Sequence, residues 1–335
     1  MATIYEVSRL AGVSLATVSR VMNDSNAVRQ STKDKVNLAI QQLNYKPNSV
    51  AKSLASSRSD CIGVLVSELD SPFFTKLLGS IEAVCKRSDK HLVVTSCHND
   101  AQHEKEDIEF LIGRNCDALI LHVEGVSDEY LVELSQGPIP IVVLNRYIPK
   151  IASKCFSLNN ELGGYLATKA TIEKGHREIV YISGPAHKAD ALQRLVGHKR
   201  ALAEAGIRLD ESRLFMGDYL QLGGQQGYEH FIQKGVSFTA VICGNDEMAT
   251  GVMAAARDAG LTLPEDLSIM GFDDVIFSRY TFPRLSTIEN PIARMGEMAA
   301  TTVMQEVYKK PGGPIKNLFE PKLISRESVV NIVCD

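Results

Sequence analysis

The sequence predicts an α/β protein in two unequal parts, a small basic module of three helices and a larger, doubly wound α/β body. The first observation is a segregation of charge. Residues 1–58 contain eight Lys or Arg and three acids, which is a net charge of +5, whereas the whole chain of 335 residues carries −4, so the remainder carries −9. The second is helical spacing of apolar residues in the first 46 positions, and the third is the alternation of β-rich and amphipathic stretches from about residue 60.

The basic module has the pattern of a helix-turn-helix. Thr3 and Glu6 form a capping box at the start of a first helix, and Gly12 permits a sharp turn after it. Ser14 can cap a second helix, and residues 31–34 are expected to start a third. The expected apolar stripes of these helices are Ile4, Val7, Leu10 and Ala11; Val18, Val21 and Met22; and Val36, Ala39, Ile40 and Leu43.

The outer face of the second helix suits the major groove of DNA. It presents Leu15, Ala16, Ser19 and Arg20 in the arrangement by which a helix-turn-helix reads DNA. Arg20 can pair with O6 and N7 of guanine, whereas Leu15 and Ala16 can contact only apolar features, such as thymine methyls, or the shape of the groove. The alternative is a protein-binding module with a solvated basic face, but the charge and the turn pattern favour DNA.

A short helix is expected between this module and the body. Pro47 stops the preceding segment, and Asn48 can cap a helix over residues 49–54. One and a half turns are too short to be stable alone. We therefore expect this helix to order only on DNA, paired with its copy in a dimer. Residues 56–59 have the composition of a polar linker.

The body is predicted to contain two lobes that divide near residue 160. Its apolar runs are rich in Val, Ile and Leu, as is typical of parallel strands buried on both faces, with helical stretches between them, for example residues 74–86 and 105–112. The body is long for one sheet of this type, so two lobes fit better. The expected strands are residues 62–67, 92–96, 118–123, 141–144, 179–183, 240–243 and 267–271.

Polar and aromatic residues follow the ends of six of these strands, where a parallel sheet forms its ligand crevice. Taken singly, Asp70, Asn245 and Asp273 could be ordinary helix caps. Together the set predicts a carbohydrate site, because Asp, Asn and Arg pair with hydroxyl groups and Phe offers a flat face to the C–H side of a pyranose. The candidates are Asp70, Phe73, Phe74, His98, Asn145 and Arg146 in the first lobe, and Asp190, Arg194, Asn245 and Asp273 in the second.

Long ordered motifs place these observations in a known family. Residues 3–21, TIYEVSRLAGVSLATVSRV, closely resemble the headpiece signature of the lactose/galactose repressor family, and YKPN at residues 45–48 with VAKSLA at 50–55 resembles its hinge. The resemblance extends over essentially the whole chain and is closest to the galactose-repressor branch. It implies a headpiece at residues 1–46, a hinge helix and linker at 47–59, and a body that resembles periplasmic sugar-binding proteins. The implied lobes are residues 60–160 with part of 286–320, and 161–285 with part of 320–335, with a third crossover near residues 285–291.

The resemblance also implies roles for particular residues. Leu54 matches the wedge that enters the minor groove, although its ordinary role would be packing beneath the body. Arg194, Asn245 and Asp273 match the residues that clamp the effector, and Tyr219 lies where some members stack an aromatic ring on the sugar, a pattern from which the galactose branch departs. The implied DNA contacts are Thr3, Tyr5, Ser14, Leu15, Ala16, Thr17, Ser19, Arg20, Asn23, Asn48, Ala51 and Leu54.

The sequence argues against an enzyme, a metalloprotein and a membrane protein. No Gly-rich phosphate loop follows the first strand, and no GxSxG motif occurs. The seven cysteines include no CxxC pair and are expected to be reduced. We expect no cofactor or metal and a cytoplasmic protein, because no secretion signal precedes the headpiece and no apolar run is long enough to span a membrane. A dimer is expected, since no leucine heptad follows the body.

The predicted function is a repressor that binds a palindromic operator in double-stranded DNA as a homodimer and is released by galactose or a related sugar or glycoside. The effector would close the lobes, shift the dimer and unpair the hinge helices. One alternative is a regulator that depends on a purine corepressor, because a stacked base would also use aromatic residues. Another is a sugar-binding protein that does not act on DNA. The headpiece and hinge favour the first hypothesis over the last.

Overall fold

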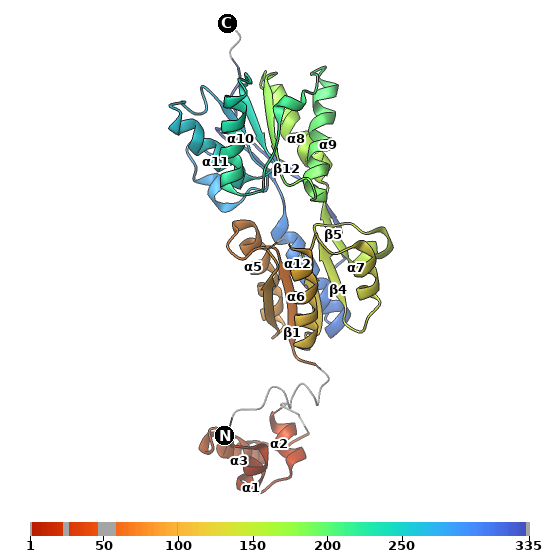
Figure 1. Cartoon of the computed structure of the whole chain (residues 1–335). Helices are drawn as coiled ribbons and strands as arrows, with labels where there is room; N and C mark the ends of the chain where they lie inside the picture. Colours follow the sequence, from red (N-terminus) through yellow and green to blue (C-terminus); the bar gives the residue numbers. More distant parts are fainter. Residues whose placement is uncertain (1, 23–26, 46–57, 99, 333–335) are drawn as a thin grey trace. The chain divides into compact units, whose positions relative to one another are not determined.

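The computed structural model describes residues 2–22, 27–45, 58–98 and 100–332, which fall into two compact units, Met1–Asp60 and Cys61–Asp335. The predicted hinge helix lies outside the described residues, as do four of the predicted DNA contacts, Asn23, Asn48, Ala51 and Leu54. Figure 1 shows the helices and strands of each unit.

The first unit is the headpiece, which contains α1 (Ile4–Ala11), α2 (Leu15–Met22) and α3 (Gln30–Gln42). The expected capping box is present, because the backbone N–H of Thr3 donates to the Glu6 carboxylate over 2.7 Å and the Thr3 hydroxyl accepts from the N–H of Glu6. Gly12 ends α1 with a φ of 65°, the left-handed conformation that glycine adopts without strain. Ser14 Oγ accepts from the N–H of Thr17 over 3.2 Å at the start of α2. The sequence therefore specifies this turn locally.

The headpiece core is small and consists of Val7, Val18, Val21, Val36 and Ala39, with partly buried side chains around it. The prediction that Leu10 belongs to the buried stripe of α1 is wrong, because this side chain is 50% exposed. A module of three short helices buries only a narrow part of each one, and the edge of the stripe stays in solvent. The third helix begins at Gln30, one residue before the expected start, and its N-cap residue makes no side-chain cap.

The second unit, the body, contains two parallel sheets. We call the six-stranded sheet and its helices the N-terminal lobe. Its strand order is β11-β5-β4-β3-β1-β2, with parallel pairing throughout. Its strands are β1 (Cys61–Val66), β2 (His91–Ser96), β3 (Ala118–Leu121), β4 (Ile141–Leu144), β5 (Cys155–Leu158) and β11 (Leu318–Phe319). Its helices are α5 (Pro72–Arg87), α6 (Ala101–Gly113), α7 (Asp128–Ser135) and α12 (Ile292–Tyr308), with the short η1 (Pro149–Lys154).

We call the four-stranded sheet and its helices the C-terminal lobe. Its strand order is β7-β6-β8-β9, again parallel. Its strands are β6 (Ile179–Ser183), β7 (Leu214–Met216), β8 (Ala240–Cys243) and β9 (Ser268–Met270), and an antiparallel pair follows, β10 (Thr287–Glu289) with β12 (Lys322–Ile324). Its helices are α8 (Asn160–Glu173), α9 (Ala189–Glu204), α10 (Gln221–Gln233) and α11 (Asp246–Asp258), with the short η2 (Glu211–Arg213) and η3 (Ile276–Arg279).

All seven expected strands are present, and most are fully buried, which is why they lack the alternation of a half-exposed strand. Sequence reasoning missed β5, β7, β10, β11 and β12. Four of these, β7, β10, β11 and β12, have three residues or fewer, so they give no strong apolar run. Within the described residues the chain passes between the lobes after β5, after β10 and after β11.

The helices α8 and α9 pack unusually closely, and this packing positions the central part of the body (Figure 1). A Cβ atom on Gly164 would lie 1.9 Å from the carbonyl oxygen of Arg194, and one on Gly197 would lie 1.9 Å from that of Glu161. Only glycine allows the two backbones to approach in this way. The backbone of Arg194 is therefore fixed directly against α8.

Candidate functional site

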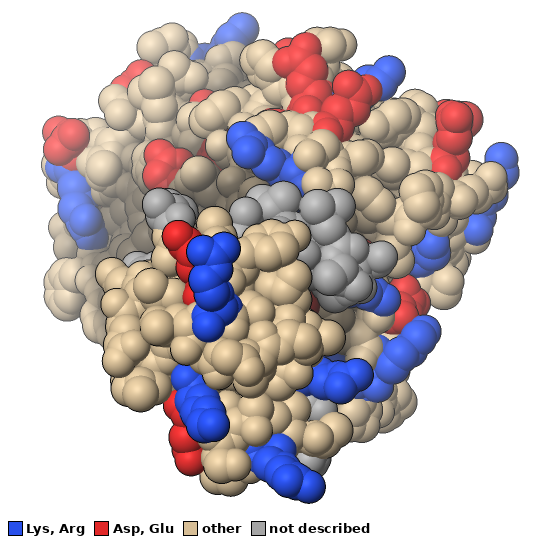
Figure 2. All heavy atoms as spheres, turned by 90° about the horizontal axis from the view of Figure 1, so that it is seen from below, with Lys and Arg blue, Asp and Glu red and all other residues tan. Residues whose placement is uncertain are grey.

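The recognition face of the headpiece is arranged as the sequence predicts. Ala16, Ser19 and Arg20 are exposed and Leu15 is partly exposed, whereas Val18 and Val21 on the opposite side of α2 are buried. The hydroxyls of Ser14 and Thr17 lie 2.9 Å apart at the start of this helix. Tyr5 is 66% exposed, and Thr3 is exposed although its hydroxyl caps α1. The predicted DNA contacts within the described residues therefore remain accessible. In Figure 2, Lys and Arg side chains project at several points of the face in view.

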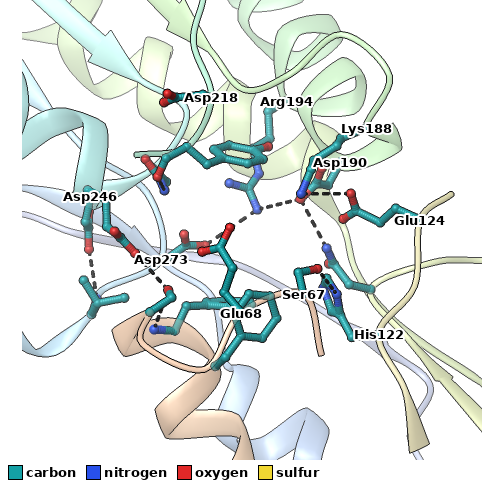
Figure 3. Close-up of a pocket in the computed structure, with 18 residues that line it drawn as sticks. Ser67, Glu68, His122, Glu124, Lys188, Asp190, Arg194, Asp218, Asp246 and Asp273 are labelled. Carbon is teal, nitrogen blue, oxygen red and sulfur yellow. Dashed lines mark hydrogen bonds and ion pairs between the residues drawn. The ribbon is translucent and has the colours of Figure 1, made fainter. Parts of the chain in front are cut away.

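The body contains a polar cavity between its two lobes, at the carboxyl ends of strands from both sheets (Figure 3). Its empty space is about 620 Å³, part of which is open to solvent. We call it the central pocket. Eight of the predicted effector residues line it: Phe73, Phe74, Asn145, Asp190, Arg194, Tyr219, Asn245 and Asp273.

Three predicted effector residues lie elsewhere. Asp70 and His98 line an adjacent hollow that contains Leu220 and Phe277. Asp70 is not the cap of α5 either, because Ser71 accepts from the N–H of Phe73 in that role. Arg146 points toward the start of α7, where it donates to the carbonyl of Val126 over 2.8 Å and pairs with Asp128 over 2.6 Å. These residues follow strand ends, but their side chains turn away from the central pocket.

Arg194 is the central cation of this pocket and is almost completely buried. Its Nε donates to Asn160 over 3.0 Å and its Nη1 donates to the carbonyl of Gly244 over 2.6 Å. Nη2 lies 3.6 Å from carboxylate oxygens of both Asp190 and Asp273, so the guanidinium stands between two acids (Figure 3). The guanidinium carbon lies 3.7 Å from the centroid of Phe272, which holds the group in place by cation–π stacking.

Asn245 and Asp273, the predicted partners of Arg194, both form hydrogen bonds within the fold and also line the pocket. Asn245 caps α11 by accepting from the N–H of Met248, and its amide donates to the carbonyl of Tyr219 over 2.7 Å. The ordinary reading of Asn245 as a cap is thus confirmed, while the residue also lines the pocket. Asp273 accepts from Asn290, and burial raises the pKa of its carboxyl to about 6, although Arg194 and Asn290 act in the opposite direction.

Several buried polar atoms of the pocket have no hydrogen-bond partner among the described residues. They are Nε2 of His122, Oδ1 of Asn145 and Oη of Tyr219. Burial lowers the pKa of His122 to about 4, so its ring is neutral near pH 7 and one nitrogen can donate while the other accepts. Unsatisfied buried polar groups are costly unless a ligand or water satisfies them. The pocket therefore offers donors and acceptors to a polar molecule.

Polar contacts between described residues join the lobes around the pocket. Ser71 Oγ donates to Glu247 over 2.8 Å, Asn145 donates to Asp190 over 3.2 Å, and Nζ of Lys188 lies 3.0 Å from Glu124. In each contact one residue comes from the N-terminal lobe and the other from the C-terminal lobe. Any change in the angle between the lobes must break or rearrange these bonds.

The predicted effector residues do not include ten residues of the lining: Ser67, Glu68, Ser71, His122, Glu124, Lys188, Asp218, Asp246, Glu247 and Val275. The strand-end rule could have found some of them. Ser67 directly follows β1 and His122 directly follows β3, but both fall inside the longer strands that the sequence predicts, 62–67 and 118–123. Asp246 and Glu247 have the ordinary appearance of acids in the first turn of a helix. Burial raises the pKa of Asp246 well above its usual value, and its carboxylate accepts from Thr287 and from the N–H of Val275.

Within the described ranges, no group of three or more His, Cys, Asp or Glu side chains is placed to hold a metal ion. No helix in this part of the chain combines the length and apolar character needed to cross a membrane.

The chain combines a helix-turn-helix headpiece with a two-lobed body that contains a polar pocket. This combination defines a class of regulators in which one part is suited to DNA and another to a small ligand. Two family models match the chain: "Bacterial regulatory proteins, lacI family" over residues 3–48 and "Periplasmic binding protein-like domain" over residues 168–329. The chain is 37% identical over 329 residues to the HTH-type transcriptional regulator GalR of Escherichia coli K12, covering 98% of this chain and 96% of that protein. It is 35% identical to the ribose operon repressor of Haemophilus influenzae, covering 99% of this chain and all of that one.

A solved structure agrees with these matches. It is the crystal structure of the lac repressor dimer bound to operator and the anti-inducer ONPF. This chain superposes on it with a TM-score of 0.87 and 26% sequence identity, over 98% of this chain and 99% of that one. The chain therefore belongs to the lacI family of bacterial regulatory proteins. It is a transcriptional regulator and not an enzyme, and its fold is the predicted one of a helix-turn-helix headpiece on an α/β body.

Proposed function

We propose that the protein represses transcription by binding a palindromic operator as a homodimer and that a neutral sugar in the central pocket releases it. The observation that carries the sugar proposal is the set of unpartnered buried polar atoms beside aromatic rings. Among the described residues, His122, Asn145 and Tyr219 present donors and acceptors, and Phe73 and Phe74 stand edge to face with their centroids 5.2 Å apart. This combination suits a molecule with hydroxyl groups on its rim and C–H groups on its face.

The charge of the pocket favours a neutral effector over a phosphorylated one. Its two cations, Lys188 and Arg194, are already paired with acids, Lys188 with Glu124 and Arg194 with Asp190 and Asp273. The acidic side chains in the lining are Glu68, Glu124, Asp190, Asp218, Asp246, Glu247 and Asp273. A phosphate would therefore lie among acidic side chains, with both cations of the described lining already engaged, and burying an unpaired charge is costly.

Exposed apolar residues on the C-terminal lobe support the homodimer. Tyr280 is 78% exposed and Phe282 is 85% exposed, in the loop after η3, and Ile276 of η3 is 60% exposed. Leu220 and Leu222 at the start of α10 are also exposed, and Leu220 lines the same hollow as Phe277. Large exposed aromatic side chains of this kind typically mark an association surface. A second copy is the fitting occupant, because a palindromic operator is read by two headpieces related by twofold symmetry.

The proposed response is a linkage between the pocket and the headpieces. The three polar contacts between the lobes hold one interlobe angle, and a bound sugar would hold another by replacing some of these partners. The sugar can weaken the free energy of operator binding by no more than the difference between its own binding free energies for the two states, the one that binds DNA and the one that does not. Such a regulator would act on the bacterial chromosome and hence in the cytoplasm.

The test combines two measurements on the full chain. A thermal-shift screen of monosaccharides, their phosphates and purine bases should give stabilisation by a neutral sugar only. Fluorescence anisotropy on a palindromic operator should then show release by that sugar. Stabilisation by a purine, with tighter operator binding, would favour a corepressor mechanism instead. Sugar binding without operator binding at moderate salt would contradict a role on DNA.

A further inference from the structure

The turn that follows β9 has a strained backbone at two successive residues. The φ angle is 108° at Asp273 and 51° at Asp274, in the region that residues other than glycine rarely adopt. Such a conformation is unfavourable by itself and persists only where the contacts around it hold it in place. What holds this turn also fixes part of the central pocket, because the Asp273 carboxylate lies 3.6 Å from Nη2 of Arg194 (Figure 3).

The two carboxylates of this turn have different surroundings. Asp273 lines the central pocket, whereas Asp274 does not line it and is only 4% exposed. Both carboxylate oxygens of Asp274 accept hydrogen bonds, from the side chains of Ser278, Arg279 and Arg326. Burial would raise the pKa of Asp274, but the bonds from the two arginines hold this pKa below its ordinary value, so the carboxylate is ionised near pH 7.

Arg326 is the better buried of the two arginines. Its side chain is 13% exposed, whereas that of Arg279 is 55% exposed and forms an ion pair that solvent screens. Nη2 of Arg326 pairs with Asp274, and Nη1 donates to the carbonyl of Leu285 over 2.7 Å. The backbone N–H of Arg326 donates to the hydroxyl of Ser286 over 2.9 Å. Arg326 therefore joins the strained turn to the segment before β10, although it does not line the central pocket.

Backbone hydrogen bonds hold the two ends of the turn. The N–H of Asp273 donates to a backbone carbonyl of β10 over 2.7 Å, and the N–H of Val275 donates to the Asp246 carboxylate over 2.9 Å. Between these ends, the side chain of Asp274 opposes relaxation of the strained backbone to negative φ. Such relaxation would rotate the side chain of Asp273 and move its carboxylate away from Arg194.

We propose that Asp274, held by Arg326, is a positioning residue for recognition of the effector. Their ion pair keeps the strained turn in the conformation that presents the Asp273 carboxylate beside Arg194. Sugar affinity then depends on Arg326, a side chain outside the lining of the central pocket. This inference rests on the proposed function, because it assumes that the central pocket binds a sugar.

The first test compares two variants of the full chain that both lack the carboxylate, by isothermal titration with galactose. Asp274→Ala should bind galactose roughly ten-fold or more weakly than the parent, because Asp273 loses its position as a charged acceptor. Asp274→Gly should regain part of this loss, since glycine adopts a positive φ without strain. Both variants leave Arg326 without this partner, so a purely stabilising role would lower both melting temperatures and leave both galactose affinities unchanged.

Arg326→Lys tests the partner of Asp274. This variant keeps the positive charge and should fold, but an ammonium group cannot reproduce the fork that reaches both Asp274 and the carbonyl of Leu285, so galactose should bind more weakly. Arg284→Ala is the matched control, because Arg284 forms an ion pair with Glu327, the next residue after Arg326, but is 62% exposed and does not line the central pocket. It should leave galactose affinity unchanged.

A crystal structure of Asp274→Ala without sugar tests the inference separately from the proposed function. We expect Asp273 to adopt a negative φ and its carboxylate to lie farther from Arg194 than in the parent. An unchanged turn, or an unchanged galactose affinity in Asp274→Ala, would overturn the inference and leave the sugar proposal standing. Equal affinities in Asp274→Ala and Asp274→Gly would also overturn it, because the strain of the turn would then have no effect. If the parent binds no monosaccharide, the proposed function fails and the crystal structure alone decides the inference.

Discussion

The headpiece and the central pocket are built in opposite ways. The side chains of α2 that we propose to contact DNA come from one run of seven residues, Ser14 to Arg20. They stay in solvent because the same short helix buries Val18 and Val21 on its other side. The pocket collects residues from position 67 to position 275 and buries them. An exposed side chain of α2 can be replaced without disturbing the residues around it. A buried side chain that is paired with its neighbours cannot, so an Arg→Ala substitution should have different consequences in the two regions.

The largest effect is expected in the pocket. Arg194→Ala should still bind operator but should no longer release it, with the sugar affinity lowered by roughly 100-fold or more, because the charged Nη2 donor between Asp190 and Asp273 is lost. Removing one partner of a buried ionic cluster also costs about 3–5 kcal/mol, so the melting temperature should fall as well. Anisotropy titrations of sugar against the operator complex, alongside thermal melts, measure both effects.

Arg200→Ala is the control for this variant, because Arg200 lies on the same helix but is exposed and paired with Glu161. It should change neither property noticeably. A lower melting temperature in Arg194→Ala with normal release by sugar would mean that Arg194 only stabilises α9 through Asp190.

A smaller and more selective effect is expected in the headpiece. Arg20→Ala should lower specific operator affinity by about 1–3 kcal/mol and leave non-specific binding and folding nearly intact, because Arg20 is exposed and would pair with a guanine. Arg9→Ala provides the comparison, since Arg9 is exposed on α1 and outside the recognition helix. Gel shifts with operator and with unrelated DNA separate the two contributions. Equal losses on both kinds of DNA would rule out base reading by Arg20.

A pH effect should follow from the buried carboxyl of Asp273, whose pKa is raised to about 6 mainly by burial. If the ionised carboxylate accepts a sugar hydroxyl, sugar affinity should fall as the pH drops through 6, by about ten-fold per pH unit at most.

Folding stability should respond with the opposite sign. A raised carboxyl pKa stabilises the folded state most below about pH 4, and this contribution is lost as the pH rises to about 6. Titrations between about pH 5 and pH 8 test this, and Asp273→Asn should abolish the dependence. A flat profile in the parent protein would exclude Asp273 as an ionised acceptor.

The smallest predicted effect compares two serine caps. Ser71 caps α5 and also bonds Glu247 of the other lobe, whereas the cap that Ser127 forms on α7 lies within the N-terminal lobe. Ser71→Ala and Ser127→Ala should each lower the free energy of unfolding by about 1 kcal/mol, because each removes a helix cap. Ser71→Ala should lose about 1 kcal/mol more, because the buried Glu247 carboxylate is left with fewer donors. Equal melting temperatures would show that the bond between the lobes contributes nothing to stability.

The sequence by itself determined the features that depend on neighbours along the chain. The Thr3–Glu6 capping box, the turn at Gly12 and the buried strands such as β4 and β6 follow from local hydrogen bonding and from uninterrupted apolar runs. The family signature is equally contiguous, and so the headpiece can be identified from the amino-acid sequence alone.

Only the tertiary structure decided which strand-end residues meet. Asp70, His98 and Arg146 satisfy the same sequence rule as Asn145 and Asp273, yet they do not reach the central pocket, while His122, Glu124 and Lys188 do. The rule gives the end of the sheet at which a residue lies but not the direction of its side chain, which depends on partners such as Asp128 for Arg146. The close approach of α8 to α9 at Gly164 and Gly197, and the hydrogen bond from Asn145 to Asp190 of the other lobe, likewise join positions far apart in the chain. Contacts of this kind leave no local pattern along the sequence.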